Sequence, residues 1–130
     1  MKFLIADDHA NVRRGLREIL VDAFAGATFS EAANGTEALI LLSVSIPDIL
    51  LLDINMPGPS GMEILKEVKA TYPQLPVIMV SVQSASQYAP YCVSAGAAAY
   101  INKSYASDDL APAIGKILGG LAQASSPRAA

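Results

Sequence analysis

The sequence predicts an α/β fold, (βα)5, in which a parallel sheet of five strands carries helices on both faces. Three observations support this prediction. Short apolar runs recur along the chain, amphipathic segments of helical length lie between them, and 130 residues with 52% hydrophobic and 16% charged side chains suit one domain with one core. Strands that alternate with helices are joined by crossover connections, which make the sheet parallel and cover both of its faces.

The five strands are expected where runs of four or five mostly apolar residues occur. These runs span residues 2–6, 28–32, 49–52, 77–80 and 98–101. At least three of the runs, including ILLL at 49–52 and VIMV at 77–80, are apolar at successive positions. Continuous apolar runs are typical of strands that are buried on both faces.

The helices are expected in the intervals between the strands. The first is indicated by an apolar stripe from Val12 to Ala23, and the second and third are expected over 36–44 and 61–71. Pro90 restricts the fourth to a short helix over about 90–95, because proline is tolerated mainly in the first turn. The fifth carries a stripe from Leu110 to Leu121.

The start of the fifth helix has its own signal. Ser107 is expected to be the N-cap, followed by two aspartates in the first turn, Asp108 and Asp109. Residues 122–130 are small, polar and proline-containing, which is typical of a linker. The predicted domain therefore spans residues 1–121.

Composition excludes several classes of function. A net charge of −3 argues against sequence-independent binding of nucleic acid, which requires clustered Lys and Arg. The single cysteine, Cys92, has no partner for an internal disulfide, which suits a reducing compartment. The N-terminal run is too short and too acidic for a signal peptide, and no apolar run has the length of a membrane span. We therefore expect a cytoplasmic protein with no membrane partner.

Polar side chains follow the ends of four of the predicted strands. They are Asp7 and Asp8, Asp53, Ser81 and Lys103. Each alone has a common structural explanation as a turn residue, a cap or a solvated charge. Because the carboxyl ends of parallel strands meet at one edge, where open α/β sheets form their functional crevice, we expect these side chains to lie together.

The chemistry of this set is that of phosphoryl transfer. Neighbouring carboxylates repel one another unless a cation neutralises them, and oxygen ligands suit Mg²⁺. Lys103 and Ser81 would hold phosphoryl oxygens by charge and hydrogen bond. Asp53, at the end of the central strand, is the expected nucleophile, so the expected product is an aspartyl phosphate.

The same residues carry a resemblance to a known family. The matching segments are the acids Asp7 and Asp8, LLLDINMPGPSG at 50–61, VS at 80–81 and YINK at 100–103. Together they resemble the receiver domain of bacterial two-component response regulators. The segment DDHANVRRGL at 7–16 is similar to the NarL/FixJ class, whose members carry a LuxR-type helix-turn-helix after the receiver. The resemblance covers residues 2–121 and implies a flavodoxin-like, doubly wound sheet of strand order 2-1-3-4-5.

The resemblance also implies roles for individual residues. Asp53 is the phosphoacceptor, Ser81 and Tyr100 are the switch residues, and Lys103 binds the phosphoryl group. Mg²⁺ is held by Asp8, by Asp53, by the backbone carbonyl of Asn55 and, through water, by Asp7. Arg13, Arg14 and Arg17 form either a face for the phosphodonor or a solvated helix face, and the sequence leaves both alternatives open.

The implied activity is signalling. The phosphoryl group comes from a histidine kinase or phosphotransfer domain, catalysis is limited to the chain's own phosphorylation and dephosphorylation, and activation produces a homodimer. DNA would be bound only through a C-terminal domain beyond this chain. Two alternatives are a single-domain regulator that acts by protein contact and a haloacid-dehalogenase-like phosphatase. The phosphatase is disfavoured because its DxD motif would need an acid where Asn55 stands.

Overall fold

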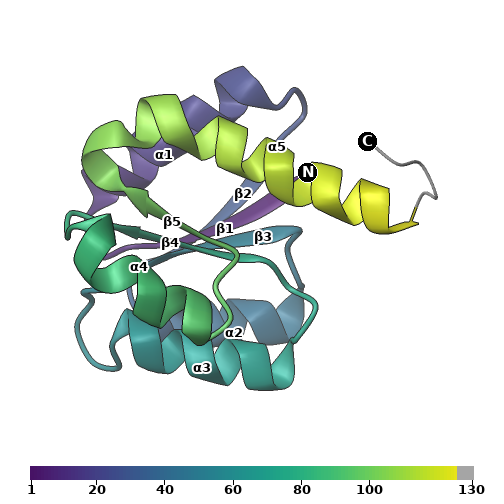
Figure 1. The fold of residues 1–130 in the computed structure, drawn as a ribbon. Helices are drawn as coiled ribbons and strands as arrows, with labels where there is room; N and C mark the ends of the chain where they lie inside the picture. The colour runs from purple at the N-terminus through teal and green to yellow at the C-terminus, as the bar shows by residue number, and fades with distance from the viewer. Residues whose placement is uncertain (126–130) are drawn as a thin grey trace.

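Five parallel strands form the central layer of the structure, a computed structural model that describes residues 1–125 and the side chains of residues 1–119. The strands lie in the order β2-β1-β3-β4-β5, which confirms the predicted topology (Figure 1). Their bounds are β1 Lys2–Ala6, β2 Thr28–Ala32, β3 Ile49–Asp53, β4 Val77–Ser81 and β5 Ala99–Asn102. The first two coincide with the prediction, and β3 and β4 each run one residue further, to Asp53 and Ser81.

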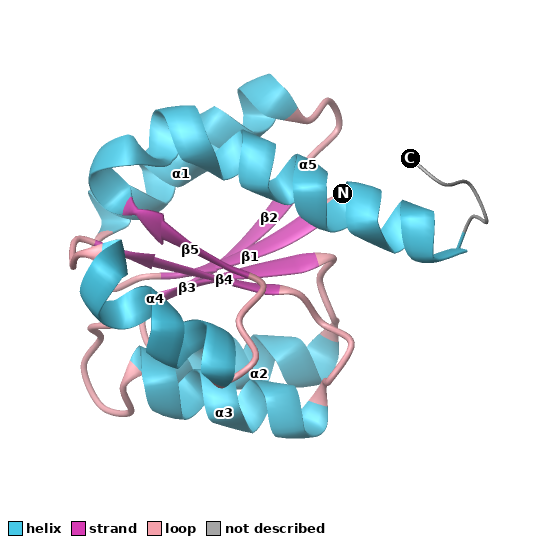
Figure 2. Ribbon diagram, in the orientation of Figure 1, coloured by secondary structure: helices cyan, strands magenta, loops and turns pink. Residues whose placement is uncertain are grey.

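The helices cover the two faces of the sheet, as Figure 2 shows. Helices α1 (Ala10–Ala23) and α5 (Ala106–Ser125) lie on one face; α2 (Gly35–Val44), α3 (Gly61–Thr71) and α4 (Ala85–Ser94) lie on the other. Side chains of successive strand residues point to opposite faces. Thus Leu4 packs into the core under α2, α3 and α4, whereas Phe3 and Ile5 pack under α1 and α5.

Three strands are buried on both faces, as predicted. Every residue of β3 and β4 is buried, and so is every residue of β1 after Lys2. The edge strand β2 is mostly exposed and has Ala32 as its buried residue. The apolar inner strands therefore fix the sheet, and their last residues deliver polar groups to its carboxyl edge.

The prediction for the fourth helix is wrong at its start. Helix α4 begins at Ala85 and contains Pro90, whereas the predicted helix began at Pro90. The first turn is already closed before the proline, by hydrogen bonds from the Gln87 and Tyr88 N–H groups to the Ser84 carbonyl. Pro90 is exposed, so its ring costs one hydrogen bond of the helix without disturbing the core.

The prediction that Ser107 caps the fifth helix is also wrong. A 3-10 turn, η1 (Lys103–Tyr105), follows β5 directly and leads into α5 at Ala106. The Asn102 side chain caps this turn by accepting a 2.8 Å hydrogen bond from the Ser104 N–H. Ser107 therefore lies within the first turn of α5, together with Asp108 and Asp109, whose positions agree with the prediction.

Helix α5 packs by its predicted stripe and continues beyond it. Leu110 and Ile114 are fully buried, and Ile117 and Leu118 pack against the same core. The side chain of Leu121 lies outside the described side chains. The helix continues to Ser125, so residues 122–125 of the expected linker are helical, and residues 126–130 lie outside the described part of the chain. No helix within residues 1–125 is long and apolar enough to cross a membrane.

Candidate functional site

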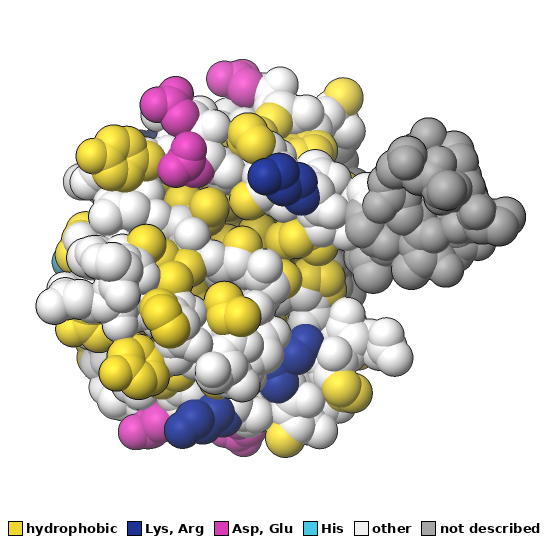
Figure 3. Space-filling view, viewed as in Figure 1, with side chains coloured by type: hydrophobic (Ala, Val, Ile, Leu, Met, Phe, Trp, Pro, Cys, Tyr) yellow, Lys and Arg dark blue, Asp and Glu magenta, His cyan; other side chains and the backbone are white. Residues whose placement is uncertain are grey.

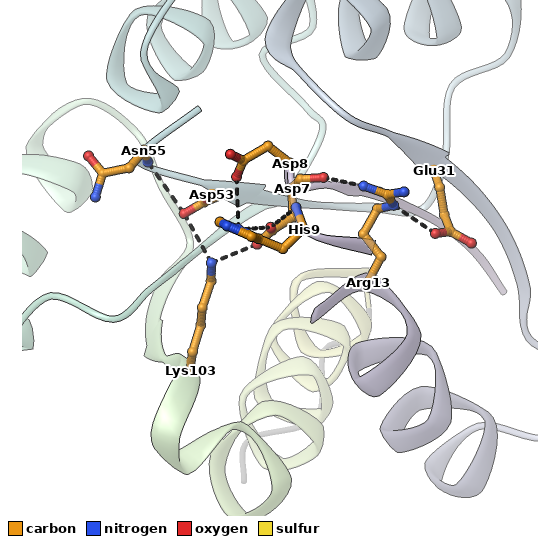
Figure 4. Close-up of polar contacts among 8 residues, drawn as sticks. All are labelled: Asp7, Asp8, His9, Arg13, Glu31, Asp53, Asn55 and Lys103. Atoms are coloured by element: carbon orange, nitrogen blue, oxygen red, sulfur yellow. Dashed lines mark hydrogen bonds and ion pairs between the residues drawn. The ribbon is translucent and has the colours of Figure 1, made fainter. Parts of the chain in front are cut away.

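The predicted site residues meet at the carboxyl edge of the sheet. The strands run parallel and in register, with Ala6 beside Leu52, Asp53 beside Val80 and Ser81 beside Asn102. Their ends therefore place Asp7, Asp53, Ser81 and Lys103 on one edge. Figure 4 shows Asp7, which follows β1, and Asp53, the last residue of β3, facing the amine of Lys103.

One amine neutralises two buried carboxylates. The Nζ atom of Lys103 lies 2.7 Å from Asp7 Oδ2 and 3.4 Å from Asp53 Oδ1 (Figure 4). The two carboxylates are 2% and 4% exposed, respectively. Burial raises the pKa of Asp53, repulsion from Asp7 raises it further, and Lys103 partly offsets both effects. The site therefore favours an additional cation or a proton.

Asp7 is held by several neighbours, whereas Asp8 retains free coordination capacity. The Asp7 N–H donates to the Ala32 carbonyl at 3.0 Å, and Asp7 Oδ1 accepts from the His9 N–H at 2.8 Å. Asp8 Oδ1 is buried and makes no hydrogen bond to the described residues, although His9 Nδ1 lies 3.1 Å away. Asp7 Oδ2, which faces Lys103, is likewise buried without a hydrogen bond to the described residues, and carboxylate oxygens of this kind suit a cation.

The donors of this cluster fit a hard metal ion. Ligand atoms of Asp7, Asp8 and His9 all lie within 4.8 Å of one another. Carboxylate oxygens are preferred by Mg²⁺, and the imidazole of His9 is 68% exposed. The backbone N–H of Asn55 donates to Asp53 Oδ1 at 3.3 Å, which holds the β3–α3 loop against the phosphoacceptor candidate (Figure 4).

Gln83 joins the two predicted switch residues, and the sequence reasoning missed it. The Oγ atom of the fully buried Ser81 accepts a 3.1 Å hydrogen bond from the Gln83 N–H. The Gln83 carbonyl in turn accepts a 2.8 Å bond from the Tyr100 hydroxyl. Burial raises the pKa of this hydroxyl, so it remains a donor. Serine often bonds the backbone two residues on, but the sequence offers several serines here and does not select one.

The three arginines of α1 all have partners within the chain. Arg13 Nε and Arg17 Nη1 bind the two carboxylate oxygens of Glu31 on β2, at 2.8 and 2.9 Å. Arg14 Nη2 donates to Asn11 Oδ1 at 2.9 Å. Their assignment to a partner face stays a prediction. The role of Glu31 was not predicted, because it depends on how β2 lies beside α1.

Comparison with known proteins agrees with this geometry. Residues 3–115 match the family described as response regulator receiver domain. The glycerol metabolism activator of Pseudomonas putida is 35% identical over 120 residues, which cover 92% of this chain and 54% of that protein. The chain thus spans about half the length of this relative.

Two solved structures have the same fold and a related sequence. A LuxR-family two-component response regulator from an Aurantimonas species is 32% identical with a TM-score of 0.83, over 92% of this chain and 85% of that one. A CheY-like receiver domain protein from Methanospirillum hungatei is 28% identical with a TM-score of 0.81, over 92% and 94%. The chain belongs to the family of response regulator receiver domains.

Proposed function

We propose that Asp53 accepts a phosphoryl group from the phosphohistidine of a sensor histidine kinase or a phosphotransfer domain. The observation that carries the proposal is the buried Asp53 carboxylate, 4% exposed, with the Lys103 amine 3.4 Å away. In the transfer, an Asp53 oxygen forms a bond to phosphorus while the phosphorus–nitrogen bond breaks, and the electron pair of that bond leaves with the imidazole. The chain acts as a phosphoacceptor whose catalysis is confined to gaining and losing its own phosphoryl group.

Lys103 and Ser81 would receive the phosphoryl oxygens. The Lys103 amine already lies between the carboxylates of Asp7 and Asp53. A small displacement would therefore let it pair with an oxygen of a phosphoryl group on Asp53. Ser81 accepts a hydrogen bond from Gln83, which leaves its O–H to donate to a phosphoryl oxygen. Positioning and charge neutralisation of this kind are what phosphoryl transfer requires.

The acidic cluster would hold Mg²⁺. Asp8, Asp53 and the backbone carbonyl of Asn55 are the proposed ligands, with Asp7 acting through water. The buried Oδ1 of Asp8, without a hydrogen bond to the described residues, supports this assignment. The bound ion would neutralise the acids and the phosphoryl oxygens, as it does in other phosphoryl-transfer sites.

Gln83 would transmit the conformational change from Ser81 to Tyr100. Movement of Ser81 toward a phosphoryl group shifts the loop whose Gln83 carbonyl holds the Tyr100 hydroxyl. Tyr100 lines a groove of about 420 Å³ between β5 and α5. Apolar side chains gather between α5 and α4 on this face (Figure 3). A phosphoryl group on Asp53 can shift the equilibrium between two conformations of this face only by the difference between its interaction free energies in the two conformations.

The output would be transcriptional control in the cytoplasm. Arg14 and Arg17 on α1 are proposed to contact the phosphodonor, and activation would produce a homodimer. The relative from Pseudomonas putida is named as an activator of glycerol metabolism, and the Aurantimonas neighbour as a LuxR-family regulator. These names support control of transcription through a DNA-binding domain outside this chain. A single-domain regulator that acts by protein contact is the alternative.

Phosphorylation by a small acyl phosphate tests the proposal. With Mg²⁺ and acetyl phosphate, mass spectrometry should find one added phosphoryl group on the wild type and none on Asp53→Ala. The control variant Asp22→Ala, an exposed acid at the end of α1, should be labelled like the wild type. Equal labelling of wild type and Asp53→Ala, or labelling of neither, would exclude Asp53 as the phosphoacceptor.

A further inference from the structure

Arg13 connects the edge of the sheet to the acidic cluster. Its Nη1 atom donates a 2.6 Å hydrogen bond to the backbone carbonyl of Asp7, while its Nε atom binds Glu31 Oε1 at 2.8 Å. Figure 4 shows the guanidinium between Glu31 and the backbone of the two acids. The Arg13 side chain is 17% exposed, compared with 48% for Arg17 on the next turn.

We propose that Arg13 is a positioning residue for the metal site: by holding the Asp7 carbonyl it orients the Asp8 carboxylate. This inference rests on the proposed role of Asp8 as a Mg²⁺ ligand. The carbonyl in question belongs to the peptide that joins Asp7 to Asp8. Because a peptide unit is planar, fixing its oxygen also fixes the N and Cα atoms of Asp8.

The orientation of Arg13 is set by residues outside the site. Glu31 lies on β2 beside Ile5 of β1, and its two oxygens receive Arg13 and Arg17. Arg17 also lies over the ring of Phe29, 5.4 Å from its centroid. Charge-assisted bonds of this kind are shorter and stronger than neutral ones. The guanidinium is therefore aimed at the Asp7 carbonyl before any ligand binds.

The geometry separates this role from contact with a partner protein. Two donor groups of Arg13 are directed inward, one to β2 and one to the β1–α1 loop, and the side chain is largely covered. A residue that serves mainly a partner would present its donors to solvent. The inference thus moves Arg13 from the predicted partner face to the support of the metal site.

Calorimetric titration of the full chain with Mg²⁺ tests this role without any phosphodonor. Arg13→Ala should raise the dissociation constant for Mg²⁺ about tenfold, the scale expected for residues that orient metal ligands. Arg13→Lys should recover part of the affinity, since an ammonium reaches one of the two partners but lacks the planar fork. Lys66→Ala removes a positive charge from the exposed face of α3 and should leave the affinity unchanged within about twofold.

Two further measurements separate orientation from general damage. Raising Mg²⁺ to saturation should recover most of the acetyl phosphate labelling that Arg13→Ala loses at limiting Mg²⁺, because its defect lies in metal binding. Adding Glu31→Gln to Arg13→Ala should cause no further loss of Mg²⁺ affinity, since Glu31 acts through Arg13. Circular dichroism checks that each variant is folded. If Arg13→Ala is unfolded, the Mg²⁺ affinity of Arg13→Lys is compared with that of the wild type instead.

The outcomes distinguish this inference from the proposed function. If the wild type binds Mg²⁺ and is labelled on Asp53, but Arg13→Ala keeps wild-type Mg²⁺ affinity, the positioning role is wrong and the proposed function stands. A defect confined to transfer from a phosphohistidine protein would make Arg13 a partner contact and would equally overturn the inference. A wild type that neither binds Mg²⁺ nor is labelled would remove the basis of both.

Discussion

Gly61 shows how a single residue determines the position of the site's backbone. Its N–H donates a 2.7 Å hydrogen bond to the Ile54 carbonyl, which closes the β3–α3 loop under Asp53. A Cβ atom at this position would lie 2.1 Å from the Asp53 carbonyl oxygen and 2.6 Å from Ile54 Cα. Both neighbours are backbone atoms that cannot rotate away. Any side chain must therefore displace the segment that carries the phosphoacceptor candidate.

The variant Gly61→Ala should lose about 1–3 kcal/mol of the free energy of unfolding, the usual cost of forcing extra atoms into a packed site. It should also be labelled more slowly by acetyl phosphate, because the displaced backbone belongs to Asp53. Urea denaturation and the labelling rate measure the two effects. Gly115→Ala is the control: that glycine lies in α5 with open space around its Cβ position, so the variant should gain about 0.5–1 kcal/mol. Equal stability of the two variants would show that the β3–α3 loop adapts.

At the same scale, the sequence predicted which residues meet and failed to predict how they pair. Asp7, Asp53, Ser81 and Lys103 could be placed together because each follows a parallel strand. The closer contact of Lys103 with Asp7, at 2.7 Å, than with Asp53, at 3.4 Å, follows from loop conformation, which a residue pattern does not encode. The bridging role of Gln83 depends on the same kind of information.

Helix α4 is the element that sequence reasoning described least well. The rule that proline is tolerated mainly in the first turn of a helix placed the start of α4 at Pro90, whereas the helix begins at Ala85 and runs through the proline. Proline removes the hydrogen bond to the carbonyl four residues earlier and crowds it, yet it does not prevent a helix whose other contacts are kept. Within α4 the buried anchor is Cys92, whereas α3 buries Ile64, Leu65 and Val68 as well as Gly61. Such sparse burial predicts low local stability.

Replacing Pro90 with alanine should therefore stabilise α4. The new N–H can bond the Ser86 carbonyl, and we expect a gain of about 1–2 kcal/mol, less than the full helix penalty of proline because the unfolded chain also becomes freer. Hydrogen exchange of the α4 amides should slow in step with the gain in thermal stability. Pro73→Ala, in the exposed loop after α3, should lose a few tenths to about 1 kcal/mol instead. Faster exchange in α4 of the Pro90→Ala variant would contradict this explanation.

For the whole molecule, the sheet and its layers could be predicted because the physical rule is simple. Continuous apolar strands separated by helices permit few arrangements, and the order β2-β1-β3-β4-β5 agrees with the one that the family resemblance implied. The two hydrophobic cores, one on each face of the sheet, stabilise the fold enough to tolerate the mutual repulsion of buried acids at the carboxyl edge. There the buried carboxylates of Asp7 and Asp53 share the amine of Lys103, in a chain whose net charge is already −3.

This arrangement makes the stability of the molecule depend on pH and on divalent cations. Folding raises the pKa of Asp53 above its ordinary value of 3.8, first through burial and then through repulsion by Asp7. A group with a raised pKa in the folded state contributes its stability below the ordinary pKa and loses it as pH rises through the raised value. Removing the charge should therefore help most near neutral pH. We expect Asp53→Asn to be more stable than wild type by about 1 kcal/mol or more at pH 7 in the presence of a chelator.

The difference should shrink as pH falls toward the ordinary carboxyl range, where Asp53 is protonated in both states. It should also shrink when Mg²⁺ is added at pH 7, because a cation bound to the acids stabilises the wild type by mass action. Thermal denaturation between pH 4 and pH 8, with and without Mg²⁺, measures both trends, and Asp22→Asn should follow the wild type throughout because its carboxylate is exposed. If Asp53→Asn were instead the less stable protein at pH 7, the attraction of Lys103 would outweigh burial and the repulsion of Asp7, and the charge at this edge would be structural rather than held ready for a cation.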